Sequence, residues 1–209
     1  MRDFLIFVLL SSLPYQLTSQ NFKRIDSLSI QLSDDAVHSE NDLVTYCEAN
    51  ASTDLERVRF YFVWIATHVD YDAENLEPRS SEKLNSAADI FTQRKAVCSG
   101  FAALLAQFCA ASGIPARYVS GYGRDADDPV LVERHAWNVI KIGERWHHFD
   151  VTWAANALEN RTSDALNADF EQWFQSPRSV FLAAHLPFDP AFQLADEPIS
   201  REEYQDSQS

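Results

Sequence analysis

Residues 96–122 read AVCSGFAALLAQFCAASGIPARYVSGY, and this stretch decides the fold. Its first part, residues 98–112, is apolar on nearly every side and is followed by the stop signal Gly113-Ile114-Pro115. Such a segment predicts a helix buried in the centre of a domain. From residue 116 to 122 the composition changes to β-branched and aromatic residues, which favour a strand. A buried helix leading into a sheet is therefore expected.

Two further short segments, residues 135–142 and 145–153, have the same strand-like composition. Between them Gly143-Glu144 supplies a tight turn with glycine first, as a type II′ hairpin turn prefers. The sequence therefore predicts an antiparallel sheet of at least three strands, with residues 116–122 providing the third.

Helices are expected on both sides of these strands. Residues 53–68 begin with the capping-box pattern Thr53-Asp54-Leu55-Glu56 and then carry apolar residues at helical spacing. A short helix is predicted near residues 86–92, and Ser176-Pro177 should open a last helix that runs to about residue 185. Helices, then strands, then a helix indicate an α+β fold with a central helix packed against an antiparallel sheet.

The composition fits one compact domain. The chain has 209 residues, of which 46% are hydrophobic and 12% aromatic, and this is enough apolar material for one core. We expect the domain to cover residues 20–200 and residues 201–209 to form a flexible acidic tail.

The charge balance restricts the possible partners. Seventeen Lys and Arg residues face 31 Asp and Glu residues, which gives a net charge of -14. A chain of this charge repels nucleic-acid phosphates and anionic lipid surfaces. We therefore expect no nucleic acid and no membrane as a partner beyond an export leader.

The first residues are typical of such a leader. An apolar run from Phe4 to Leu10 is followed by small and polar residues up to Gln20. The run is too short to span a bilayer as a helix, and it fits a signal peptide over residues 1–19, cleaved near Ser19. Export to the periplasm or the medium is the expected outcome, and an uncleaved membrane anchor is the alternative, because Asp3 weakens the positive start.

The three cysteines differ in their expected surroundings. Cys98 follows Val97 at the start of the predicted buried helix, where free N–H groups and the helix dipole favour a thiolate. Cys47 and Cys109 lie within helices and have no such field, so they are interpreted as small buried residues. Cys98 is the expected nucleophile.

A thiol nucleophile needs a histidine to move its proton and a partner that orients that histidine. In a two-residue hairpin His135 and Asp150 project from the same face, as opposite or diagonal neighbours. His148 shares this face and is a competing candidate, whereas His147 points the other way and is a weak one. The joint occurrence of a helix-start cysteine, a strand histidine and a same-face carboxylate favours Cys98, His135 and Asp150 as a catalytic triad.

Several ordered segments resemble the transglutaminase-like superfamily. The string from Ala96 to Tyr122 and HAWNVIKIGERWHHFDVTW from residue 135 to 153 look like its core, and WIATHVDYD from residue 64 resembles a helix end of the family. Residues 170–200 resemble the tail of the kyphoscoliosis-peptidase-like branch. The resemblance covers roughly residues 40 to 200, and it is specific as an ordered set of motifs.

The resemblance implies a papain-like fold with Cys98 as nucleophile, His135 as base and Asp150 as the orienting residue. It implies thiol-dependent acyl transfer at amide bonds of a protein or peptide, with hydrolysis favoured over glutamine crosslinking or deamidation. A non-catalytic binding module on the same fold is the third reading.

The remaining site residues are less strongly indicated. Gln93 is a weak candidate for an oxyanion donor, with an exposed helix-end glutamine as the alternative. Aromatic residues that could wall a cleft, or be plain core, are Tyr71, Trp137 and Trp153. The scattered histidines lack zinc-site spacing and the acidic residues 125–128 lack the EF-hand pattern, so neither a metal nor another cofactor is expected.

Overall fold

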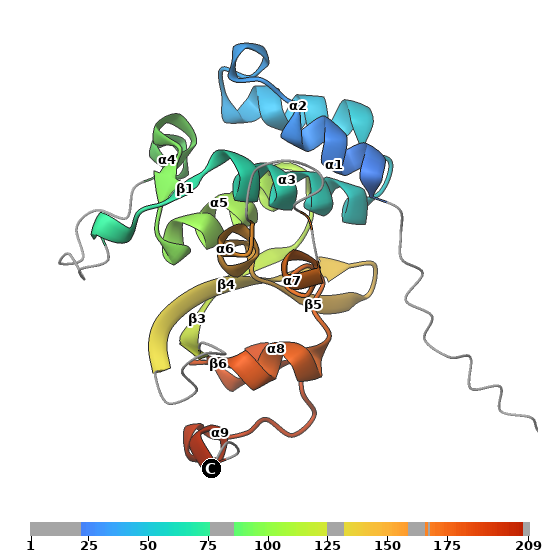
Figure 1. The fold of residues 1–209 in the computed structure, drawn as a ribbon. Coiled ribbons are helices and arrows are strands. Elements are labelled where there is room, and N and C mark those ends of the chain that lie inside the picture. The colour runs from blue at the N-terminus through green and yellow to red at the C-terminus, as the bar shows by residue number, and fades with distance from the viewer. Residues whose placement is uncertain (1–21, 76–85, 125–131, 159–165, 167, 207–209) are drawn as a thin grey trace, which may run out of the picture.

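The computed structural model describes residues 22–75, 86–124, 132–158, 166 and 168–206 (Figure 1). The predicted leader, residues 1–19, lies outside this part of the chain. Within the part described, no helix has both the length and the apolar character needed to cross a membrane. The helices and strands, in chain order, are α1 (Lys23–Ile30), α2 (Glu40–Asn50), α3 (Asp54–His68), β1 (Asp70–Tyr71), α4 (Ala87–Gln93), β2 (Lys95–Ala96), α5 (Cys98–Ala111), β3 (Ala116–Arg124), β4 (Val132–Ile142), β5 (Arg145–Phe149), α6 (Val151–Asn156), α7 (Ala168–Glu171), α8 (Arg178–Ala184), β6 (His185–Pro187) and α9 (Arg201–Asp206).

The main sheet has four antiparallel strands in the order β5-β4-β3-β6. The β4–β5 hairpin pairs Ile142 with Arg145, and its turn residue Gly143 has a φ of +58°. This confirms the three predicted strands and the glycine-first turn. The sequence did not indicate β6, whose approach to β3 depends on Gly121, because a Cβ there would collide with the backbone of β6 and with Trp137.

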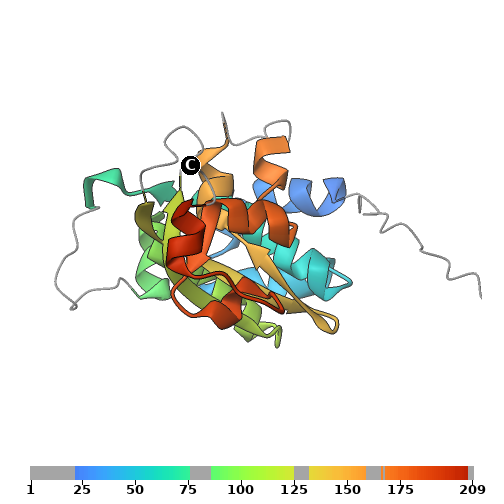
Figure 2. The same ribbon diagram turned by 90° about the horizontal axis from the view of Figure 1, so that it is seen from below.

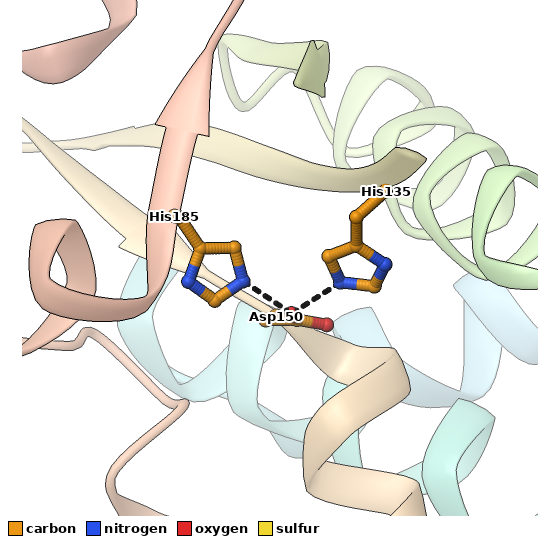
Figure 3. Close-up of side chains that lie close together, drawn as sticks. All are labelled: His135, Asp150 and His185. Atoms are coloured by element: carbon orange, nitrogen blue, oxygen red, sulfur yellow. Dashed lines mark hydrogen bonds and ion pairs between the residues drawn. The ribbon is translucent and has the colours of Figure 1, made fainter. Parts of the chain in front are cut away.

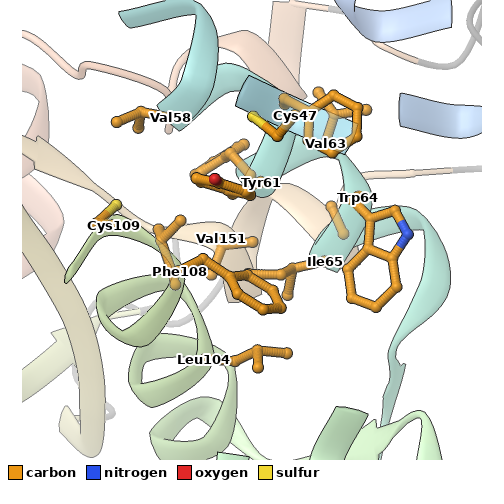
Figure 4. Close-up of a cluster of buried hydrophobic side chains, with 14 of the residues drawn as sticks. Cys47, Val58, Tyr61, Val63, Trp64, Ile65, Leu104, Phe108, Cys109 and Val151 are labelled. Atoms are coloured by element: carbon orange, nitrogen blue, oxygen red, sulfur yellow. The ribbon is translucent and has the colours of Figure 1, made fainter. Parts of the chain in front are cut away.

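The central helix α5 packs on one face of the sheet, against β3 and β4, as the sequence predicted. Helix α3 lies against α5 on the side away from the sheet, and α1 and α2 cover α3 (Figure 1). Nearly every side chain of α3 from Val58 to Thr67 is buried, so this helix forms the middle of the larger core. Figure 4 shows Cys47 of α2 and Cys109 of α5 within this core.

The opposite face of the sheet is covered by C-terminal segments, which face the viewer in Figure 2. A smaller core there joins Val119 of β3 and Trp137 and Val139 of β4 to Phe181 of α8. Because side chains alternate along a strand, His135 projects toward this same face. The His135 side chain therefore leaves its strand on the side of the sheet that α8 covers.

The helix ends follow local rules that the sequence displays. The Thr53 side chain accepts a hydrogen bond from the Glu56 N–H at 3.2 Å, and Ser86 and Asp89 form a complete capping box at the start of α4. At the end of α5, Gly113 has a φ of +71°, a conformation that glycine adopts without a steric penalty. These three predicted helices are confirmed.

The helix predicted from Ser176-Pro177 to about residue 185 is confirmed as α8, with His185 as its C-cap and as the first residue of β6. Two expectations differ from the structure. The strand predicted over residues 145–153 ends at Phe149, because the Asp150 side chain caps a new helix, α6. Residues 201–206 form α9 instead of a flexible tail, since Tyr204 is only 2% exposed and its ring lies 4.2 Å from the Arg124 guanidinium carbon.

A charge cluster around the buried Arg59 links the N-terminal helix α1 to the rest of the domain. Arg59 of α3 is fully buried and donates to both carboxylate oxygens of Asp26, at 2.7 and 3.1 Å. It also donates to both oxygens of Glu171, at 2.8 and 2.5 Å. Phenylalanine rings lie over its guanidinium group at 4.7 to 5.3 Å: Phe22, Phe170 and Phe174. The cluster links α1, α3 and α7.

Candidate active site

Asp150 is the anchor of the candidate site. It is fully buried at the N-terminus of α6, where its Oδ1 accepts the backbone N–H groups of Thr152 and Trp153, both at 3.0 Å. Its Oδ2 accepts from two imidazole rings, those of His135 at 2.7 Å and His185 at 2.9 Å (Figure 3). Burial alone would raise the pKa of Asp150, but the charge of His135 and these hydrogen bonds hold it far below its usual range.

His135 is held as a cation by this carboxylate. The side chain is 7% exposed, and burial alone would lower the pKa of its ring. The charge and hydrogen bond of Asp150, with a smaller contribution from Cys98, instead raise the pKa to about 10. Trp153 of α6 stacks on the ring at 5.0 Å between centroids. The imidazolium is thus fixed by an ion pair on one edge and an indole on one face.

Cys98 is the first residue of α5 and is partly exposed. The first intrahelical bonds run from Gly100 and Phe101 to the Val97 carbonyl, so the Cys98 N–H lies ahead of the helical ladder. Cys98 is close enough to His135 to contribute, after Asp150, to the raised pKa of the histidine. Because Nε2 of His135 faces Asp150, Nδ1 is the nitrogen left for the thiol, and it points toward α5 in Figure 3.

A short parallel pairing holds Tyr71 beside this helix start. Strand β1 pairs with β2, which places Tyr71 opposite Ala96, two residues before Cys98. Burial, and then the proximity of Cys98, raise the pKa of the Tyr71 phenol to about 12, so it stays protonated near neutral pH. Among the three aromatic residues considered for a cleft wall, Tyr71 lies near Cys98 and Trp153 covers His135, whereas Trp137 is 1% exposed and belongs to the smaller core.

The other two cysteines have surroundings that suit core residues. Both are fully buried, and neither forms a disulfide. Burial raises the pKa of Cys47 to about 12, and it also raises the pKa of Cys109 well above its ordinary value. The neutral thiol is therefore the dominant form of both at physiological pH.

The competing histidines occupy different environments. His148 is buried on the same face as His135, but its Nε2 faces the Phe192 carbonyl at 2.9 Å, and burial lowers its pKa to about 4. His147 is half-buried, and its pKa is lowered by burial and by Arg145. Gln93 is exposed at the last position of α4, as the helix-end interpretation expected.

The sequence did not single out His185, which shares the Asp150 oxygen with His135. It lies 35 residues beyond Asp150 in a segment read as the end of a helix. The only hint was its place within residues 170–200, the part that resembles the kyphoscoliosis-peptidase-like branch. Only the pairing of β6 with β3 brings it to the site.

His135, Asp150 and His185 also offer three possible metal ligands, whose donor atoms lie within 4.8 Å of one another. Metal binding would require both histidines to be deprotonated toward the ion. The raised pKa of His135 opposes this at neutral pH. The arrangement is better matched to one carboxylate that accepts hydrogen bonds from two imidazole rings.

Comparison with known proteins assigns the chain to a family. A family model described as transglutaminase-like superfamily matches residues 41–151, more than half of the chain. This chain belongs to the transglutaminase-like superfamily. The match contains Cys98, His135 and Asp150 and ends at the first residue of α6.

Individual relatives extend the similarity over nearly the whole chain. Kyphoscoliosis peptidase from Mus musculus is 29% identical over 203 residues, which are 95% of this chain and 30% of the relative. Hillarin from Drosophila melanogaster is 21% identical over 206 residues, 88% of this chain and 24% of that protein. This transglutaminase-like chain therefore spans less than a third of the length of these relatives.

Among solved structures, a proposed cysteine protease from Cytophaga hutchinsonii is 27% identical to this chain. The alignment covers 59% of this chain and 44% of that one, with a TM-score of 0.44.

Proposed function

We propose that this protein is a cysteine hydrolase that cleaves amide bonds in a protein or peptide, with Cys98, His135 and Asp150 as its triad. The observation that carries the proposal is the position of His135, which bonds Asp150 at 2.7 Å through Nε2 and interacts with Cys98. A nucleophile, a proton carrier and an orienting carboxylate in this order are the parts that thiol catalysis requires.

In the proposed reaction the Cys98 thiolate attacks the amide carbonyl carbon and forms a tetrahedral adduct. The C–N bond then breaks, the His135 imidazolium gives its proton to the leaving amine, and a thioester remains. His135, now neutral, takes a proton from water, whose oxygen attacks the thioester carbonyl. The acid leaves, the thiolate is restored, and Asp150 stabilises the imidazolium in each half of the cycle.

The start of α5 suits the negative charge that develops on the carbonyl oxygen. The Cys98 N–H precedes the first intrahelical bonds, and the positive end of the helix dipole lies at the same place. We assign the backbone N–H of Cys98 as one oxyanion donor. The exposed position of Gln93 gives no reason to assign it the second.

Two other functions share the same residues. If an amine rather than water resolves the thioester, the protein crosslinks glutamine side chains, and if the first leaving group is ammonia, it deamidates them. Hydrolysis is favoured because the relatives over nearly the whole chain include proteins named peptidases. The remaining candidate is a binding module that uses the fold without chemistry.

Labelling of Cys98 separates catalysis from binding. We expect iodoacetamide at pH 7 to modify Cys98 at least tenfold faster in the intact protein than in His135→Ala, as followed by peptide mass spectrometry. Equal rates would favour the binding module. Incubation with casein and a labelled amine, followed by mass spectrometry, then distinguishes new termini, amine incorporation and deamidation.

We also propose that residues 1–19 direct export and are removed near Ser19, because a short apolar run followed by small and polar residues is typical of a signal peptide. Intact-mass measurement of protein recovered from the medium or periplasm tests this. A mass that includes residues 1–13 would contradict cleavage and favour an anchor.

A further inference from the structure

We propose that His185 is a positioning residue of this site: its Nε2–H donates to Asp150 Oδ2 and fixes the carboxylate that orients His135. This inference rests on the proposed function. The two rings share one acceptor oxygen but differ in position, since His135 interacts with Cys98 whereas His185 is fully buried. His185 therefore acts on the reaction through Asp150 and not by direct proton exchange with a substrate.

The bonds to Asp150 leave its carboxylate little freedom. Oδ1 accepts hydrogen bonds from two backbone N–H groups at the start of α6, and Oδ2 accepts hydrogen bonds from two imidazole rings. Each carboxylate oxygen has two lone pairs, so the four donors match the full accepting capacity of the carboxylate. Without His185 one lone pair would be buried without a partner, and the carboxylate could turn away from His135.

The proton of His185 can be placed from its neighbours. Nδ1 faces the Phe181 carbonyl at 3.2 Å, and Nε2 faces Asp150 at the shorter distance of 2.9 Å. The Phe181 carbonyl also accepts the backbone N–H of His185. Both ring nitrogens therefore face acceptors, and in the neutral ring the single proton belongs on Nε2, because a hydrogen bond to a charged carboxylate is stronger than one to a carbonyl.

The charge of His185 follows from its burial. The titratable groups around it are Asp150, His135 of β4 and His148 of β5. Burial lowers the pKa of His185, and the cationic His135 lowers it further, while Asp150 acts in the opposite direction. A neutral donor strengthens the hold on Asp150 without adding a second cation that would compete with His135 for the carboxylate charge.

Aromatic side chains fix the ring in this orientation. Phe181 of α8 stacks on it at 3.9 Å with planes 13° apart, and Trp153 lies at 4.2 Å. Trp137 and Trp173 make edge-to-face contacts with it, with ring centroids 4.9 and 5.5 Å away. Trp153 also stacks on His135, so one indole contacts both imidazoles. The enclosure prevents His185 from reaching solvent, which suits a fixed donor and not a proton shuttle.

A matched pair of variants separates the hydrogen bond from the packing. His185→Phe keeps an aromatic ring between its neighbours but removes the donor, whereas His185→Gln loses the ring but places an amide N–H near the same point. We expect iodoacetamide labelling of Cys98 at pH 7 to slow about tenfold in His185→Phe and to recover most of this loss in His185→Gln. The acid limb of the labelling profile should move to higher pH in His185→Phe, because Asp150 protonates more easily without this donor.

The outcomes distinguish this inference from the proposed function. Equal labelling rates of Cys98 in the intact protein and in His135→Ala would contradict the proposed triad. If those two rates differ but His185→Phe has the rate and the pH profile of the intact protein, only the role of His185 is overturned. The same holds if His185→Gln is labelled no faster than His185→Phe. If either variant fails to fold, nitrogen NMR of the intact protein decides: a proton on Nε2 of His185 from pH 5 to 9 is expected, and the Nδ1–H form, which has no proton to donate to Asp150, overturns the inference.

Discussion

The domain contains two charge clusters that each join one buried central ion to two partners but differ in what their protons can do. Around Asp150, a carboxylate binds two imidazoles, and one of these rings interacts with a partly exposed thiol. Around Arg59, a guanidinium binds Asp26 and Glu171. Arginine keeps its proton at any physiological pH, so the cluster around Arg59 links helices without exchanging protons.

The difference teaches that burial of charge does not by itself mark a reactive site. Arg59 has no exposed surface, and all of its partners hold it in place. His135 has one nitrogen on Asp150, which stays ionised and orients the ring, and the other on the side of Cys98, where it can exchange a proton with an accessible group. Four predictions test this distinction.

Asp150→Asn should give the largest effect on reactivity. An amide can still cap α6 through its oxygen, but it cannot stabilise the imidazolium, so amide hydrolysis should fall about a thousandfold. Cys98 labelling at pH 7 should fall only about tenfold, because an ordinary thiol still has a small fraction of thiolate at this pH. Thermal unfolding should change far less than the rate. If stability and labelling fall together, Asp150 has a mainly structural role, like Arg59.

Arg59→Ala should give the largest effect on stability. Removing it leaves Asp26 buried without its partner, which costs about 3–5 kcal/mol of unfolding free energy in comparable pairs. Denaturant unfolding measures the loss. Arg57→Ala is the matched control on α3, because Arg57 is partly exposed and pairs with Asp54 at 2.9 Å, and it should cost under about 1 kcal/mol.

Labelling of Cys98 completes that test. Under conditions where Arg59→Ala remains folded, the rate should equal that of the intact protein, because the guanidinium holds no proton that the reaction uses. A slowed rate in a folded Arg59→Ala would show that the two clusters are not independent.

The pH dependence of stability should belong to the Asp150 cluster. The pKa of His135 is raised from 6.5 to about 10 on folding, so its stabilising effect is full below pH 6.5 and declines as the pH rises toward 10. Between pH 6.5 and 8.5 this contribution amounts to a loss of about 2–3 kcal/mol. A native Cys98 thiolate offsets it, because the unfolded thiol keeps its proton in this range, so unfolding experiments at several pH values should show the full slope in Cys98→Ser, the background in which the variants below are compared.

The same slope should be nearly absent in Asp150→Asn, where the pKa of His135 is no longer raised by a carboxylate, and should persist in Arg59→Ala. His148 and His185 have lowered pKa values and stay neutral in this range, so they do not produce it. An unchanged slope in Asp150→Asn would assign the pH dependence to other groups.

Glu171→Gln should give the smallest effect. Its side chain is 45% exposed, so water replaces much of what the ion pair loses, and the glutamine oxygen can still accept from Arg59. We expect a loss of about 1 kcal/mol in denaturant unfolding. A loss as large as that of Arg59→Ala would mean that Asp26 alone cannot hold the guanidinium.

Much of the fold and part of the site were predictable because their signals are local. The apolar run that begins at Cys98 indicated α5, the glycine-first turn at Gly143 indicated the hairpin, and side-chain alternation placed His135 on the face of Asp150. The structure adds the contact between the two side chains. The strand was predicted too long because Asp150 serves both as a partner of His135 and as the cap of α6.

The sequence by itself determined which residue types stand at the helix start and along the hairpin, because helix capping, turn geometry and strand alternation act over a few neighbouring residues. Only the tertiary structure decided that His185 shares Asp150 with His135 and that Tyr204 packs on Arg124. These contacts join residues 35 and 80 positions apart. Such partners are set by how β6 and α9 pack on the sheet, which no local pattern records.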